Sequence, residues 1–259
     1  MHLETIVDLS AHPIVGRGYA DRCRATLETQ GVLALSGFVR PDALVRMRTE
    51  AQAGQKKAYF CTQNHSVYLT PPDPDLPSDH PVNRQVVSSK GCICDDDVGQ
   101  ASPLRLLYDD PQFRDFVRTV TGEDGLHPYA DPLSSINIHY AGRGQELGWH
   151  FDNSSFAITL LIEKPDAGSR FEYVRDLRDA DAGEMNADGV AALLDGTITP
   201  EVLEMEPGTL VLFRGRNSLH RVSPNESDTV RMLAVLAYNS QSGVALSESA
   251  RMTFYGRLS

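Results

Sequence analysis

The chain has 259 residues, of which 41% are hydrophobic, and its formal net charge is −11 with a pI near 5.1. This size and composition fit one domain with a substantial core, which we expect to span residues 1–259. An acidic chain without a basic stripe is not expected to bind nucleic acid, and no stretch approaches the roughly 18 apolar residues that a membrane span requires.

The first part of the chain, to about residue 125, is predicted to mix helices and strands. Residues 19–30 have helical composition and end at Gly31, and residues 32–38 form a short apolar run typical of a strand. A proline begins a second predicted helix over residues 41–52. The many prolines of residues 71–83 exclude regular structure there, so we expect a loop.

Two further helix starts are marked by a capping residue followed by proline. These pairs are Ser102-Pro103 and Asp110-Pro111. After the second pair, apolar residues follow at helical spacing, namely Phe113, Phe116, Val117 and Val120. Gly122 is then expected to end this helix.

From about residue 133 the pattern changes to that of strands. The apolar or alternating runs are 136–139, 156–162, 171–174, 209–213 and 230–238. Residues 175–200 interrupt them, first charged and then helical near residues 190–194. Helices followed by short strands predict a mainly β fold with flanking helices, an antiparallel barrel or jelly roll that occupies about residues 126–259.

Four polar residues stand within or beside these apolar runs. His150 and Asp152 form a His-x-Asp triplet, His220 follows 68 residues after Asp152, and Arg231 comes 11 residues after that. Residues two apart in a strand point to the same face, so His150 and Asp152 can reach one ion. Two imidazoles and one carboxylate form the facial triad that holds non-heme Fe(II) and leaves the opposite positions open.

Catalytic zinc is the alternative, because it also accepts two histidines and a carboxylate. Zinc hydrolysis does not explain why Arg231 stands in an apolar run, where an unpaired guanidinium is costly to bury. The helical His-Glu-x-x-His spacing is also missing. His139 lies on a predicted strand, where it either contacts a co-substrate or forms a hydrogen bond inside the barrel. The remaining histidines are expected at the surface or in packing roles, and they are His2, His12, His65, His80 and His127.

With these four residues, the sequence resembles the Fe(II)/2-oxoglutarate-dependent oxygenase superfamily. Residues 129–137, 148–156 and 171–174 narrow the resemblance to the branch that contains the free-amino-acid (lysine-type) radical halogenases and their hydroxylase relatives. The superfamily motif covers the C-terminal half, and the branch resemblance runs from about residue 60 onward. It implies a double-stranded β-helix (jelly-roll, cupin-like) core that uses Fe(II), 2-oxoglutarate and O2, with succinate and CO2 as co-products.

The resemblance also implies a role for individual residues. The metal is expected on His150, Asp152 and His220, and Arg231 is expected to bind the far carboxylate of 2-oxoglutarate. Further candidates for the co-substrate site are His139, Asn137 and Thr159. Candidates for contacting or covering the substrate are Asn153, Arg84, Arg251 and Tyr255.

One position separates the chemistries of the branch. Halogenating members carry a small residue, typically Gly, where this chain has Asp152, so that chloride can bind the iron. The carboxylate therefore implies hydroxylation, with desaturation and ring closure sharing the early steps. Leu147 replaces the polar substrate contact that the resemblance leads us to expect in lysine-acting relatives, which argues against lysine itself.

The sequence thus predicts a dioxygenase that hydroxylates a small polar metabolite, a free amino acid or a derivative. The alternatives are a hydroxylase of protein or peptide side chains and a non-catalytic jelly-roll protein that keeps a metal for structure. We expect a monomer or homodimer. The start of the chain has no secretory signal and the four cysteines are few and unevenly spaced, so we expect free thiols and a cytoplasmic location.

Overall fold

The computed structural model describes residues 2–259, and its eleven strands join in one antiparallel series. The strands are β1 (Val32–Leu35), β2 (Tyr59–Ser66), β3 (Gln85–Ile93), β4 (Ile136–Ala141), β5 (Leu147–His150), β6 (Ala157–Glu163), β7 (Phe171–Val174), β8 (Glu201–Leu203), β9 (Leu210–Phe213), β10 (Leu219–Val222) and β11 (Arg231–Leu236). Their order is β1-β9-β6-β11-β4-β3-β5-β10-β7-β8, and β2 pairs with β3 outside this path.

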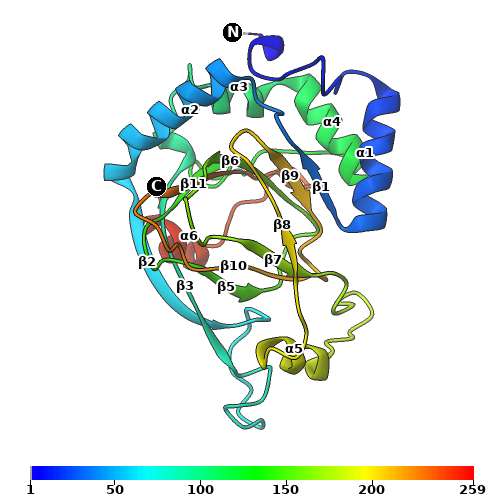
Figure 1. The fold of residues 1–259 in the computed structure, drawn as a ribbon, viewed down its shortest axis with the longest axis vertical. Helices are drawn as coiled ribbons and strands as arrows, with labels where there is room; N and C mark the ends of the chain where they lie inside the picture. Colours follow the sequence, from blue (N-terminus) through cyan, green and yellow to red (C-terminus); the bar gives the residue numbers. More distant parts are fainter. Residues whose placement is uncertain (1) are drawn as a thin grey trace.

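Strand β3 links two facing sheets (Figure 1). It pairs with β4 through Gly91–Ile93 and with β5 through Ser88, so it joins the sheet β1-β9-β6-β11-β4 to the sheet β5-β10-β7-β8. Apolar side chains from both sheets fill the space between them, including Val32, Leu161, Tyr173, Met205, Val211, Phe213 and Leu233. This arrangement is the predicted double-stranded β-helix.

Helices cover the outer face of the first sheet (Figure 1). They are α1 (Arg17–Gln30), α2 (Pro41–Gly54), α3 (Pro103–Asp109) and α4 (Pro111–Thr121), while α5 (Ala187–Leu194) and α6 (Glu248–Tyr255) lie elsewhere, and short 3-10 turns occupy Leu3–Thr5, Gln55–Lys57 and Asp95–Asp97. The carboxylate of Asp110 accepts hydrogen bonds from the backbone N–H groups of Gln112 and Phe113. The predicted N-cap of α4 is therefore confirmed, as is its end at Gly122, whose φ is +77°.

Strand β11 sorts its side chains between two cores by simple alternation. The even-numbered residues join the core beneath the helices, and they are Met232, Ala234 and Leu236. The odd-numbered Leu233 and Val235 face the barrel interior. Arg231 has the parity of Leu233, so the strand turns it inward. Pairing with β4 sets Arg231 level with Ala141 and Leu233 level with His139.

The hydrophobic pattern does not predict every element of the sheet. The hairpin of β2 and β3 lacks a clear apolar alternation, because β2 carries polar residues on both faces. Strands β5, β8 and β10 have only three or four residues each, and α6 also follows no strong pattern. The division expected near residue 125 does not separate the sheet either, since β1, β2 and β3 come from the earlier part of the chain.

None of the helices within residues 2–259 is long and apolar enough to cross a bilayer. The four cysteines are free thiols, as predicted, and three of them are buried.

Candidate metal centre and co-substrate site

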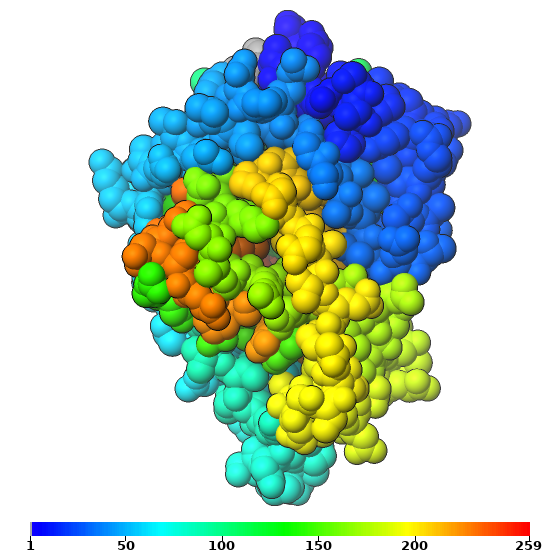
Figure 2. All heavy atoms as spheres, in the orientation of Figure 1, coloured from blue at the N-terminus to red at the C-terminus, as the bar shows by residue number. Residues whose placement is uncertain are grey.

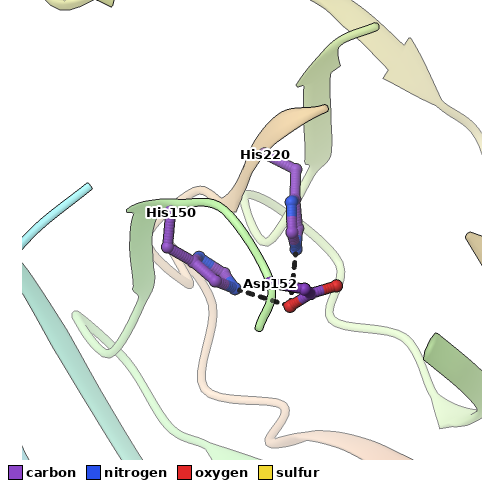
Figure 3. Close-up of side chains that lie close together, drawn as sticks. All are labelled: His150, Asp152 and His220. Atoms are coloured by element: carbon purple, nitrogen blue, oxygen red, sulfur yellow. Dashed lines mark ion pairs between the residues drawn. The ribbon is translucent and has the colours of Figure 1, made fainter. Parts of the chain in front are cut away.

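The register between β5 and β10 brings two distant histidines together. His220 is the direct cross-strand partner of His150, and their ring centroids lie 4.1 Å apart. Asp152 follows just after the end of β5, where its backbone N–H donates to the carbonyl of Gly215. The donor atoms of the two imidazoles and the carboxylate all lie within 4.8 Å of one another (Figure 3).

Each imidazole is held in one orientation by the backbone of its own strand. Nδ1 of His150 lies 2.8 Å from the carbonyl of Gly148, and Nδ1 of His220 lies 3.0 Å from the carbonyl of Ser218. A carbonyl only accepts, so Nδ1 carries the proton in both rings and Nε2 keeps a free lone pair. Burial, and then the neighbouring His220, lower the pKa of His150 well below 6.5, which favours the neutral, ligating form.

The carboxylate of Asp152 completes the set. Its Oδ1 lies 3.7 Å from Nε2 of His150 and 3.6 Å from Nε2 of His220 (Figure 3). Two ligand atoms that each lie about 2.1 Å from one ion are at most about 4.2 Å apart, so both spacings allow a shared ion. The second oxygen, Oδ2, is buried without a hydrogen-bond partner in the described chain, which a bound cation would relieve.

These donors fit Fe(II). Two imidazoles and one carboxylate on one side of an ion leave its other positions open, as oxygen-activating iron requires. Phe151, between the first two ligands, is buried away from them and stacks on Tyr68. His150 and Asp152 thus reach one point, as their spacing predicts, although the regular strand ends at His150 rather than at Asp152. The ligand roles themselves stay a prediction.

Arg231 is buried in the same barrel, with 7% of its surface exposed. No carboxylate of residues 2–259 forms an ion pair with it, and burial lowers its pKa to about 10, so it remains charged at neutral pH. It borders a cavity of about 40 Å³ that apolar residues of both sheets also line, among them Leu161, Phe171, Leu203 and Met205. The ring of Phe171 in turn lies 5.6 Å from that of His220, which connects the cavity to the metal centre.

The other co-substrate candidates share the inner face but differ in how free they are. The amide of Asn137 donates to the carbonyls of Leu133 and Ile136, and its oxygen accepts from the hydroxyl of Tyr255. Asn137 therefore has its polar atoms engaged by the protein. Thr159 lies in the same cross-strand row, on β6, and its hydroxyl forms no hydrogen bond with the described residues. The third candidate, His139, lies against the ammonium of Lys90.

Comparison with known proteins places the chain in a family. The family described as Halogenase D matches residues 84–253, which is more than half of the sequence. The chain belongs to the Halogenase D family. Among curated proteins, none matches this sequence.

Solved structures support the fold of this Halogenase D family member. An oxidoreductase of the 2OG-Fe(II) oxygenase family from Burkholderia pseudomallei has a TM-score of 0.54 and 14% identity, over 88% of this chain and 94% of that one. The non-heme alpha ketoglutarate dependent epimerase SnoN from nogalamycin biosynthesis has a TM-score of 0.59 and 12% identity, over 86% of this chain and 84% of that one. A prolyl-4-hydroxylase from Pseudomonas putida has a TM-score of 0.51 and 13% identity, over 83% of this chain and 96% of that one. Family and fold together confirm the predicted superfamily and branch.

Gly215 is a member of the site that the sequence pattern marks only as a turn. A Cβ atom at this position would lie 1.9 Å from Oδ2 and 2.6 Å from Cγ of Asp152, and 3.0 Å from Cε1 of His220. The segment before β10 can therefore approach the ligands only because residue 215 has no side chain. A glycine five residues before the distal histidine is the signal that could have suggested it.

We expect Gly215→Ala to weaken Fe(II) binding by about 10–100-fold, as the loss of a partner that orients a ligand does. The added methyl group must displace the carboxylate of Asp152. The backbone of residue 215 does not have a positive φ, so alanine is tolerated there and the fold should persist. Equilibrium dialysis with metal analysis measures the affinity. Gly99→Ala is the matched control, because a Cβ there meets nothing within 4 Å, and equal affinities of the two variants would contradict the assignment.

The segment from residue 175 to 200 lies against the ligand loop. The guanidinium of Arg178 lies 4.0 Å from the centroid of the Phe151 ring, and its Nε donates to the carbonyl of Arg216. Arg216 pairs with Asp181 and also donates to the carbonyl of Asn153. In Figure 2 the continuation of this segment, coloured yellow and gold, runs across the front of the molecule from α5 towards the N-terminal helices. Asn153 itself is exposed beside the metal ligands.

The structure engages two of the expected substrate residues elsewhere. Arg84 pairs with Asp195 at 2.6 Å, and Arg251 donates to the carbonyl of Leu258 near the C-terminus. Nε of Arg251 is buried without a hydrogen-bond partner in the described chain, so this guanidinium is only partly engaged. Tyr255 is buried and donates to Asn137, so its hydroxyl secures α6 to β4. The substrate roles of Arg84, Arg251 and Tyr255 stay predictions.

One histidine expected at the surface or in packing instead lies near the metal centre. His65 is on β2, its ring centroid lies 6.4 Å from that of His150, and its Nε2 lies 2.7 Å from the hydroxyl of Ser88. That hydroxyl also accepts from the backbone N–H of Gly148, in the strand that carries the first ligand. The local sequence does not predict this position of His65, because β2 is placed only by its pairing with β3.

Proposed function

We propose that this protein is an Fe(II)/2-oxoglutarate-dependent dioxygenase that hydroxylates an unactivated C–H bond of a small polar metabolite, a free amino acid or a derivative. The observation that carries the proposal is the pairing, inside one barrel, of a three-donor metal centre with a buried arginine that has no carboxylate partner in the described chain. A dicarboxylate co-substrate satisfies both features at once.

The residues divide the work between holding and orienting. His150, Asp152 and His220 would hold the metal, which when bound supplies the redox chemistry that activates O2. Arg231 would bind the far carboxylate of 2-oxoglutarate with two parallel hydrogen bonds and so fix its direction. In the overall reaction 2-oxoglutarate, O2 and R–H give succinate, CO2 and R–OH, so one oxygen atom enters each organic product.

Asp152 supports hydroxylation rather than halogenation. Its carboxylate lies close to both imidazoles and fills the ligand position that a halide would need. Removing that side chain is the step that would open the position. We therefore expect this member of the Halogenase D family to transfer oxygen, because its metal ligands would include a carboxylate where a halide would otherwise bind.

The surroundings of the ligand loop support a compact, polar substrate. Arg178 borders an open hollow of about 610 Å³ whose other lining residues are mostly polar, namely Asp176, Leu177, Asp179, Glu184, Asn186 and Asn217. Arg178 also stacks on Phe151 between two ligands, and Arg216 binds Asn153. These contacts keep the 175–200 segment across the ligand loop, where an extended peptide would have to displace it.

The test is turnover by the purified chain with Fe(II), 2-oxoglutarate, O2 and a panel of free amino acids and acylated amino acids. We expect succinate release in every case in which a product with one added oxygen is seen by mass spectrometry. Hydroxylation of peptides but not of free amino acids would replace the proposed substrate class. No succinate under any condition, including uncoupled turnover, would favour a metal-binding protein without activity.

A further inference from the structure

Lys90 lies on β3 and points into the same interior as His139 and Arg231. Gly91 pairs with Tyr140, whose side chain belongs to the core beneath the helices. Alternation along β3 therefore turns Lys90 to the opposite, inner face. One position on from the Gly91 pair, Lys90 is level with Ala141, which is also the register partner of Arg231. Two cations thus flank the same point of β4.

The ammonium of Lys90 has no anionic partner in the described chain. Its Nζ lies 3.3 Å from both ring nitrogens of His139 and 5.5 Å from the centroid of the Phe254 ring. Burial, and then the charges of Lys90 and Arg231, lower the pKa of His139 well below 6.5, so the imidazole is a neutral neighbour. One neutral ring cannot satisfy the three N–H donors of an ammonium.

Lys90 also lies within electrostatic reach of the metal centre. Burial lowers the pKa of Lys90, whereas the nearby Cys92, Cys61 and Asp152 raise it and Arg231 lowers it. Apart from Asp152, which the metal would take, the groups around this partly buried lysine are neutral or cationic, so an ammonium is held there at a cost in free energy. Such a cost points to a ligand that brings negative charge.

Counting the charges in the barrel shows that 2-oxoglutarate alone leaves one cation without an anionic partner. The metal site contains one carboxylate, Asp152, and 2-oxoglutarate brings two more. The proposed function assigns one of these to the metal and the other to Arg231. Lys90 is then left without an opposite charge. O2 carries no charge, so the substrate is the remaining reactant that can supply one.

We propose that Lys90 is the receptor for a carboxylate of the substrate, which it binds between His139 and the ring of Phe254. The inference rests on the proposed function and sharpens it, because it requires the substrate to carry a free carboxylate. The imidazole of His139 accepts from Lys90 and so orients the ammonium, while Phe254, at the end of α6, shields the pair from water.

The decisive variants keep the shape of Lys90 and change its charge. Lys90→Met removes the ammonium and keeps the chain length, and Lys90→Arg keeps the charge. Lys56→Met is the matched control, because Lys56 is exposed on a turn beside the N-terminal helices. Anaerobic titration calorimetry of the Fe(II)-loaded protein gives two dissociation constants without turnover. The first is the dissociation constant of 2-oxoglutarate. The second is measured in the presence of 2-oxoglutarate, separately for each free amino acid and for its primary amide.

We expect the wild type to bind an amino acid more tightly than its amide, because the neutral amide cannot form an ion pair with an ammonium. Lys90→Met should weaken binding of the acid by about thirtyfold or more, as loss of one partner of a buried charge pair does. It should leave binding of the amide and of 2-oxoglutarate unchanged. Lys90→Arg should restore part of the preference for the acid, and Lys56→Met should match the wild type.

Three results would overturn the assignment of Lys90. The first is an unchanged preference for the acid in Lys90→Met. The second is weaker binding of 2-oxoglutarate with unchanged binding of the amino acid, which would make Lys90 a co-substrate residue. The third is a wild type that binds 2-oxoglutarate but binds no carboxylate of the panel. Failure of the wild type to bind 2-oxoglutarate at all would instead contradict the proposed function.

Discussion

Replacing Asp152 with alanine is expected to abolish Fe(II) binding at micromolar metal and, with it, succinate formation. Asp152 is the one carboxylate of the metal centre found in the described residues, and its Oδ1 lies within 3.7 Å of both Nε2 atoms. Losing a residue that only orients a ligand costs about 10–100-fold in metal affinity, so losing the ligand itself should cost more than about 100-fold. Dialysis with metal analysis and a succinate assay measure the two effects.

We do not expect Asp152→Ala to lose Fe(II) because the protein unfolds. In the absence of metal the buried Oδ2 of Asp152 lacks a partner, so its removal should not lower the free energy of unfolding. Thermal unfolding of metal-free protein checks this point. Asp79→Ala removes an exposed carboxylate from the proline-rich loop and should bind Fe(II) as the wild type does. Wild-type affinity in Asp152→Ala would mean that the carboxylate is not a ligand.

Asp152→Gly tests the branch of the family more sharply. It removes the side chain altogether and leaves room for a halide next to the two imidazoles. With chloride present as a replacement ligand and Fe(II) raised above the micromolar range to offset the weaker binding, we expect hydroxylation to fall and a chlorinated product to appear. Full hydroxylation by this variant would contradict the role that we assign to the carboxylate.

Arg231→Ala is expected to raise the KM for 2-oxoglutarate by at least about a hundredfold. Breaking a buried charge pair costs about 3–5 kcal/mol, and each 1.4 kcal/mol corresponds to about tenfold in affinity. Arg231 is buried and has no carboxylate partner within residues 2–259, so the whole pairing must be made with the co-substrate. The KM is measured from uncoupled or coupled succinate release at varied 2-oxoglutarate.

Two controls separate the charge of Arg231 from its shape. Arg231→Lys keeps the charge but loses the planar fork, so an intermediate KM is expected. Arg143→Ala removes an exposed arginine that pairs with Asp228 in a turn and should have no effect. The affinity for Fe(II) should stay at the wild-type level in all three variants, and an unchanged KM in Arg231→Ala would refute the assignment.

Local physical chemistry explains why the sequence alone determined much of this protein. Helix α4 is specified by the cap at Asp110, by apolar residues at helical spacing and by Gly122, all within a dozen residues of one another. The His-x-Asp triplet, the distal histidine and Arg231 identify the chemistry because few other purposes need those side chains in apolar runs. These features predict the fold class, which is confirmed, and the metal ligands and the co-substrate residue, which stay predictions.

Tertiary structure decided the rest, because sheet register connects residues that no local pattern relates. The pairing of β5 with β10 places His220 opposite His150, and a shift by one residue would turn either ring to the other face of the sheet. Strand pairing also turns Lys90 inward, and the turn before β10 brings Gly215 beside Asp152. Tertiary contacts pair Arg84 with Asp195 and bring Arg251 to the carbonyl of Leu258. The sequence by itself therefore determined which chemical groups are present, whereas the long-range strand pairing determined which of them face one another.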